Sequence, residues 1–288
     1  MLSRIRELRT GPPADGGLRE RLTERFGAPT ALVPVGLAGS TCLVVTRDAY
    51  LIAKRMPDAW SPGQLGELFA ELARARIPGP QLLDALPLEA SWYALFTYVE
   101  GAALRADDPG WRALWASAFG LLRRLAGIPA SAAPYDLDAR WLARAAELAP
   151  GDPAAARLLE YLRTAPPAGE ARFAHGDFAP QNLLRTGTGL ALIDWADAGV
   201  ARPGFDAGWL LALNRVGAGP RLPHAELAAA LHDPEVPAAN RSWYEGLGLL
   251  RMRWRAMHLV TTRPELRWLL ERTRAGIAGY ESERRARG

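Results

Sequence analysis

Lysine is nearly absent from this chain: Lys54 is the single lysine among 35 lysine and arginine residues. Cysteine is equally scarce, and one cysteine, Cys42, excludes an intrachain disulfide and a cysteine-based metal cluster. No uncharged apolar run approaches the length of about 18 residues that spans a bilayer. The N-terminal MLSRIRELRTGPP also lacks an apolar signal core. We therefore expect a soluble, cytoplasmic protein without a membrane partner.

The composition is that of a globular protein with a slight excess of positive charge. Of 288 residues, 49% are hydrophobic, enough for one large domain or two smaller ones. The formal charge is +4, which suits anionic nucleotides and also raises the question of nucleic acid. The arginines are scattered and mostly interleaved with acids, so a nucleic-acid-binding module is not favoured. We interpret their densest cluster, Arg251, Arg253 and Arg255, as a solvated helix face.

The apolar pattern changes character near residue 100. Before it, β-branched and apolar runs alternate with turn residues, and one clear helix follows the third run. After it, helical spacing dominates. The pattern predicts an α+β fold, with a strand-rich part over 1–100 and a larger helical part over 101–288. The expected strands are 31–36, 41–48, 50–56, 81–88 and 91–99, and the main expected helices are 62–76, 108–128, 137–149 and 152–164.

The strongest chemical signal is AHGDFAPQNLL, residues 174–184, followed by LALIDW. Asp177 and Asn182 stand five residues apart, and Asp194 ends the second apolar run. The turn sequence RTGTG lies between the runs and predicts a hairpin that brings Asn182 to Asp194. A carboxylate and an amide oxygen suit Mg²⁺, which completes its shell with water and phosphates. Asp177 is then available to accept a proton from an attacking hydroxyl.

The pair H-G-D-x4-N and I-D-W resembles the motifs of the aminoglycoside phosphotransferase and choline kinase-like family, relatives of the protein kinases. This resemblance implies a two-lobed protein-kinase-like fold. The small lobe, 1–100, would hold an antiparallel sheet, one helix and the nucleotide. The lobe 101–288 would hold the catalytic loop and the acceptor site. Asp177 would be catalytic, while Asn182 and Asp194 would bind the metal.

The resemblance also gives the lone lysine a role. A lysine on the third strand of the small lobe contacts the α- and β-phosphates in this family and pairs with a glutamate of the next helix. Lys54 has that position, and its compact ammonium differs from the wide fork of arginine. We prefer Glu67 as its partner, although Glu71 lies on the same helix face.

The remaining nucleotide contacts follow from position in the family pattern. The phosphate-covering loop is expected over 35–44, with Gly36 and Ser40 as contacts. The main chain of Thr97, Tyr98 and Val99 is expected to hold the base of ATP or GTP, which the sequence does not distinguish.

Two other residues near the motifs are expected to be structural. His175 is expected to order the catalytic loop, and Asp206 to brace it.

The acceptor is expected to be a small molecule. Eleven residues separate Asp194 from Asp206, too few for the activation segment of a protein kinase. We expect Mg²⁺-assisted transfer of a γ-phosphate to a hydroxyl, with an aminoglycoside or another antibiotic among the candidates and resistance as a possible outcome. From residue 200 onward 9 acids face 14 arginines, which disfavours a polycation. Choline, homoserine or a sugar is the alternative acceptor. A pseudokinase without turnover is a further alternative, opposed by the intact Asp177, Asn182 and Asp194.

Overall fold

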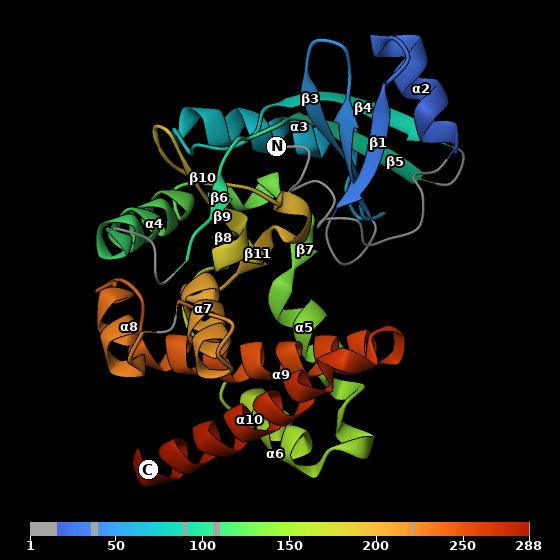
Figure 1. Cartoon of the computed structure of the whole chain (residues 1–288). Helices are drawn as coiled ribbons and strands as arrows, with labels where there is room; N and C mark the ends of the chain where they lie inside the picture. Colours follow the sequence, from blue (N-terminus) through green and yellow to red (C-terminus); the bar gives the residue numbers. More distant parts are fainter. Residues whose placement is uncertain (1–15, 36–39, 89–90, 106–109, 221, 288) are drawn as a thin grey trace. The chain divides into compact units, whose positions relative to one another are not determined.

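The computed structural model describes residues 16–35, 40–88, 91–105, 110–220 and 222–287 (Figure 1). The chain divides into two compact units, Met1–Glu100 and Gly101–Gly288. Both units contain strands and helices, and helices dominate the second, so the predicted α+β class is confirmed. Within the described ranges, every helix is too short or too polar to cross a membrane.

The first unit contains a five-stranded antiparallel sheet in the order β1-β2-β3-β5-β4. Each strand lies within one or two residues of its expected start, because β-branched and apolar residues fill the runs between turn residues. Four of the expected ends lie one to three residues too late, and the fifth, at residue 88, is confirmed. The strands are β1 (Ala31–Val35), β2 (Thr41–Val45), β3 (Tyr50–Arg55), β4 (Leu82–Leu88) and β5 (Ser91–Thr97).

The two faces of this sheet pack against different helices. Leu51 and Ala53 of β3 belong to the core cluster that includes Leu18 and Leu22 of α2 (Gly16–Phe26). Side chains alternate along a strand, so Lys54 lies on the opposite face. That face is the one against which α3 (Pro62–Arg74) packs: Ile52 pairs with Phe96, and the rings of Phe69 and Phe96 are 5.2 Å apart.

The helix α3 has clear start and stop signals in the sequence. Ser61 accepts a hydrogen bond from the Gln64 N–H at 3.2 Å, and the Gln64 side chain returns to the Ser61 N–H, a complete capping box. Pro62 occupies the first turn, where its missing N–H costs nothing. The apolar stripe of Leu65, Leu68 and Leu72 is buried. The expected helix 62–76 is confirmed with an end two residues earlier.

The second unit combines seven helices with two small sheets among the described residues. One sheet has the order β10-β9-β6 and the other β7-β11-β8. The strands are β6 (Ala102–Ala103), β7 (Tyr135–Asp136), β8 (Arg172–Ala174), β9 (Leu183–Thr186), β10 (Gly189–Leu192) and β11 (Gly199–Ala201). The helices are α4 (Trp111–Leu125), α5 (Leu137–Ala146), α6 (Pro153–Thr164), α7 (Phe205–Arg215), α8 (His224–Ala230), α9 (Ala238–Thr262) and α10 (Arg267–Arg287).

Helices α7 and α9 pack closely side by side in this unit (Figure 1). Small residues permit the approach. A Cβ added to Gly208 of α7 would meet the backbone of Tyr244 at 2.7 Å, and one added to Gly248 of α9 would meet the Cβ of Ala212 at 2.7 Å. Both distances are below normal contact, so these two positions require glycine. The helix pair is the frame behind the loop described next.

Candidate active site

The loop between β8 and β9 carries the H-G-D motif and is braced from two sides. The backbone N–H groups of His175 and Gly176 donate to the two carboxylate oxygens of Asp206, at 2.8 and 3.0 Å. The Asp177 N–H donates to Nδ1 of His175 at 3.2 Å, which leaves Nε2 to donate to the Ile193 carbonyl at 3.1 Å. The structural roles predicted for His175 and Asp206 are therefore confirmed.

Gly176 is required by the backbone of this loop. Its φ of +80° is left-handed, and an added Cβ would collide with the carbonyl oxygen of Asp197. The arginine that protein kinases place here would not fit this conformation. The small-molecule variant of the motif thus has a steric reason in this chain.

The three motif residues come together as the sequence predicts. Asn182 Nδ2 donates to the Asp177 carbonyl at 2.8 Å and lies 3.3 Å from Asp177 Oδ2. Strands β9 and β10 form the expected hairpin, and the Ile193 N–H donates to the Asn182 carbonyl at 2.9 Å. Asp194, the next residue, has a left-handed φ of 69°, which ends the strand beside Asn182. Asp tolerates this conformation better than most residues, and strain of this kind is common at functional sites.

The donor set at this end of the hairpin fits Mg²⁺. Asn182 uses its amide nitrogen toward Asp177, so its amide oxygen remains an acceptor, and Asp194 follows Ile193, which pairs with the Asn182 backbone. Magnesium is usually held by one or two protein oxygens together with water and phosphate. Among the described residues there is no cluster of three or more His, Cys, Asp or Glu that would suit another metal. The geometry fits a magnesium site of the kind that requires a bound nucleotide.

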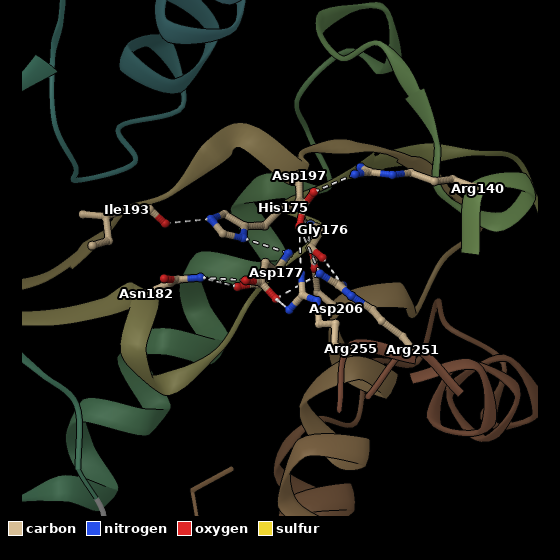
Figure 2. Close-up of polar contacts among 10 residues, drawn as sticks. All are labelled: Arg140, His175, Gly176, Asp177, Asn182, Ile193, Asp197, Asp206, Arg251 and Arg255. Atoms are coloured by element: carbon tan, nitrogen blue, oxygen red, sulfur yellow. Dashed lines mark hydrogen bonds and ion pairs between the residues drawn. The ribbon is translucent and has the colours of Figure 1, made fainter. Parts of the chain in front are cut away.

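Two arginines of α9 converge on Asp177 (Figure 2). Arg251 Nη2 lies 3.0 Å from Asp177 Oδ1, and Arg255 Nη1 lies 3.1 Å from the same oxygen. The same guanidinium groups reach Asp197 Oδ2 at 3.2 and 2.9 Å. Arg251 also donates to the carbonyl of Gly176. The α9 helix thereby holds the loop together with Asp206 of the neighbouring helix α7.

The expectation that Arg251, Arg253 and Arg255 form a solvated helix face is wrong. Arg251 and Arg253 are 2% and 6% exposed, and Arg255 is half-buried. Each has carboxylate partners from distant segments: Arg253 Nε donates to Asp152 Oδ2 at 2.9 Å, and Asp152 also caps α6. The ion pairs and hydrogen bonds offset the cost of burying these charges.

The electrostatics of the cluster keep Asp177 ionised. Burial alone would raise the pKa of Asp177, but Arg255 and then Arg251 outweigh burial and lower the pKa to about 2. Burial, and then repulsion by Arg255, lowers the pKa of Arg251 to about 9, so this guanidinium is still charged at neutral pH. Asp177 is therefore a fixed carboxylate that can orient and accept a hydrogen bond across the physiological range.

In the first unit, Lys54 is half-buried on β3, and its neighbours on α3 differ in exposure. Glu67 is exposed, whereas the Glu71 side chain is 21% exposed and pairs with Arg74. Leu65, Leu68 and Leu72 mark the buried side of α3, and Glu71 lies nearer to it on the helical wheel. Glu71 therefore lies nearer to the buried side of α3 than Glu67 does, and the choice between them as the partner of Lys54 stays a prediction.

The other predicted nucleotide contacts lie at strand ends. The Ser40 carbonyl accepts from the Arg55 N–H at 2.7 Å, directly after Lys54, while Gly36 lies outside the described residues. Thr97 ends β5, and its N–H donates to the Gln81 carbonyl at 3.0 Å. Tyr98 and Val99 follow as half-buried residues beyond the strand.

These features are those of a kinase-like phosphotransferase: a braced H-G-D loop, an Asn–Asp pair at the end of a hairpin, and an antiparallel sheet that bears one lysine. The chain belongs to the phosphotransferase enzyme family, whose family model matches residues 30–247. It is accordingly a small-molecule kinase of the aminoglycoside phosphotransferase and choline kinase type, as the motif pair suggests. No curated protein matches the chain.

Solved structures show the same protein-kinase-like fold at low sequence identity. A thermostable mutant of aminoglycoside phosphotransferase APH(4)-Ia, in ternary complex with AMP-PNP and hygromycin B, is 14% identical with a TM-score of 0.66. That comparison covers 92% of this chain and 98% of that chain. Choline kinase LicA from Streptococcus pneumoniae is 14% identical with a TM-score of 0.67, over the same shares of the two chains. Spectinomycin phosphotransferase APH(9)-Ia, in complex with AMP, is 13% identical with a TM-score of 0.63, covering 90% and 95%.

Proposed function

We propose that the protein transfers the γ-phosphoryl group of ATP or GTP to a hydroxyl of a small molecule, with Asp177 as the catalytic residue. The juxtaposition of Asp177, Asn182 and Asp194 at one end of the β9–β10 hairpin carries this proposal. Structures of nucleotide and nucleotide-analogue complexes with related folds support a nucleoside triphosphate as donor.

Each residue has a role that its surroundings permit. The ionised Asp177 orients the acceptor hydroxyl and takes its proton as the bond to phosphorus forms. Asn182 and Asp194 would hold Mg²⁺, which neutralises phosphate charge when bound. Lys54 places an ammonium on the α- and β-phosphates, with Glu71 rather than Glu67 as its partner.

Roles are also proposed for the residues that contact the nucleotide and for the two units of the chain. Tyr98 and Val99, and less directly Thr97, present main chain to the base, while Ser40 lies on the side of the phosphates. Residues 1–100 would form the nucleotide-binding lobe, and residues 101–288 would carry the catalytic loop and the acceptor site.

The test is nucleoside diphosphate release from Mg-ATP and Mg-GTP across hydroxyl-bearing compounds, with Asp177→Asn beside the wild type. Loss of the proton acceptor is expected to reduce acceptor-dependent release by about 10²–10⁴-fold. Stabilisation by nucleotide should remain, because Asp177 touches no nucleotide in this mechanism. Asp58→Asn, at an exposed turn of the first unit, is the matched control and should leave release unchanged. Absence of both nucleotide binding and release would contradict the proposed function.

A further inference from the structure

We propose that the acceptor carries an anionic group, such as a carboxylate or a phosphate, which binds to Arg144 and Arg255 beside Asp177. This inference rests on the proposed function and names the substrate class of the same site. It separates this chain from an enzyme that acts on polycations, since two arginines contact the catalytic carboxylate and two more lie around the same indole, that of Trp141.

Four guanidinium groups surround one buried indole, that of Trp141 on α5. The distances from the guanidinium carbons to the ring centroid are 4.2 Å for Arg251, 4.8 Å for Arg144, 5.5 Å for Arg140 and 5.6 Å for Arg255. Trp141 is 1% exposed, so the cations are gathered around a low-dielectric centre. Cation–π contacts of this kind hold guanidinium groups in place without neutralising them.

Two carboxylates contact these cations directly, while Asp206, Asp194 and Glu147 each act on one arginine from further away. Asp177 pairs with Arg251 and Arg255, and Asp197 pairs with both and with Arg140 at 3.0 Å. Two carboxylates therefore serve three arginines. The Arg140 Nη1 atom is also buried without a hydrogen-bond partner among the described residues. Asp194 acts on Arg255 as well, but it is assigned to the metal in the proposed function.

Arg144 is the cation without an ion pair. Over the described part of the chain its guanidinium contacts only the rings of Trp141 and Trp254, the latter at 4.6 Å. Burial, and then the positive charge of Arg140, lowers its pKa, while Asp197 and Glu147 act in the opposite direction. Glu147 also acts on Arg144, yet its Oε2 accepts from Trp254 Nε1 at 2.6 Å. Arg144 is half-buried and so remains open to a ligand from solvent.

An anionic acceptor would satisfy these groups in one pose. The Arg255 side chain is 28% exposed and already contacts Asp177. Arg144 lies against the same indole, that of Trp141, and offers a second planar guanidinium group. Guanidinium forks recognise carboxylate and phosphate oxygens with paired hydrogen bonds. An anion held there would fix the rest of the molecule, including a hydroxyl directed at Asp177. A polycation would instead meet the positive charge of Arg144, which has no ion pair among the described residues.

The test uses malonate as the anionic probe and the full chain saturated with Mg-AMP-PNP, so that the nucleotide phosphate site is filled. Tryptophan fluorescence and thermal shift are followed at constant ionic strength. We expect saturable binding that Arg144→Gln weakens about tenfold, as for loss of one charge-assisted hydrogen bond, and that Arg144→Lys partly restores. Arg163→Gln, an exposed arginine of α6, is the matched control and should bind as the wild type does.

A paired acceptor screen gives the second measurement. D-Gluconate, D-glucose and D-glucosamine are similar in size and share most of their hydroxyls, but they are anionic, neutral and cationic respectively. At low acceptor concentration, diphosphate release should therefore be fastest with gluconate. Absence of saturable malonate binding, or equal affinity in Arg144→Gln, overturns the inference. So does efficient turnover of a neutral or cationic acceptor that is unchanged in Arg144→Gln, although the kinase function then stands. Failure of Mg-AMP-PNP to bind counts against the proposed function instead.

Discussion

Replacing Arg251 with methionine tests the brace that α9 provides. The Arg251 side chain is 1% exposed and bonds Asp177 at 3.0 Å, Asp197 at 3.2 Å and the Gly176 carbonyl. Its guanidinium lies between the rings of Trp141 and Trp209, at 4.2 and 4.1 Å. Removing one partner of a buried ion pair costs about 3–5 kcal/mol. Both carboxylates keep Arg255, and the flexible methionine fills the space between the indoles, so the lower end, about 3 kcal/mol, is expected.

Calorimetry and steady-state kinetics measure the two consequences. At about 2–4 °C per kcal/mol for a unit of this size, the Tm of Arg251→Met should fall by roughly 6–12 °C. The Asp177 loop loses one brace, and kcat should fall by on the order of 10²-fold, as for a misplacement of about 1 Å. Arg251→Lys should recover little, since the compact ammonium lacks the planar fork that reaches both carboxylates and the Gly176 carbonyl. Arg285→Met, at a 65% exposed position, should stay within about 0.5 kcal/mol of wild type. A Tm change under about 2 °C together with an unchanged kcat would refute the reasoning.

Three further predictions concern the loop and the lysine. Gly176→Ala combines the penalty of a left-handed backbone with a collision against Asp197, so kcat should fall more than about 100-fold. Gly187→Ala, where an added Cβ meets open space, should leave kcat unchanged. Steady-state kinetics of both variants test this prediction. Lys54→Arg should weaken the binding of Mg-ATP about tenfold, as measured by calorimetry. Arg55→Lys, on the same strand, is the control and should bind as the wild type does. The pKa of Asp177 is lowered to about 2, so its ion pairs stabilise the fold fully above its ordinary value near 3.8 and are lost as the pH falls through about 2. Chemical unfolding at pH 2–5 should show a smaller acid loss in Asp177→Asn, and an equal loss in both proteins would contradict this.

The motif residues were predictable because their geometry is local. Asp177 and Asn182 lie in one short loop, and the turn between β9 and β10 returns the chain to Asp194 over a few residues. Spacing alone therefore predicts their proximity. Asp206 is further from the loop in the sequence, but its position follows the family pattern. Its two hydrogen bonds to the loop match the expectation.

The arginine cluster was not predictable in the same way. Arg251 follows Leu247 by four residues and Gly248 by three, so it lies on a buried face of α9. Its charge hid this signal in the sequence. Its partners Asp177 and Asp197 lie far back in the sequence, and no periodicity shows that a carboxylate will meet the helix there. Arg140 and Arg144 add a second case, since their common neighbour Trp141 reads as an ordinary core residue.

The close contact of α7 and α9 at Gly208 and Gly248 limits where α9 tolerates substitution. The glycines fix the register of two helices that hold the catalytic loop by Asp206 and Arg251, so the stretch 243–253, buried throughout, is closed to variation. Beyond it, residues 257–262 of the same helix are exposed or half-buried. One part of α9 is thus buried and constrained by packing, whereas its C-terminal end is accessible to solvent. Substitutions at the exposed end are therefore expected to leave intact the packing that holds the Asp177 loop.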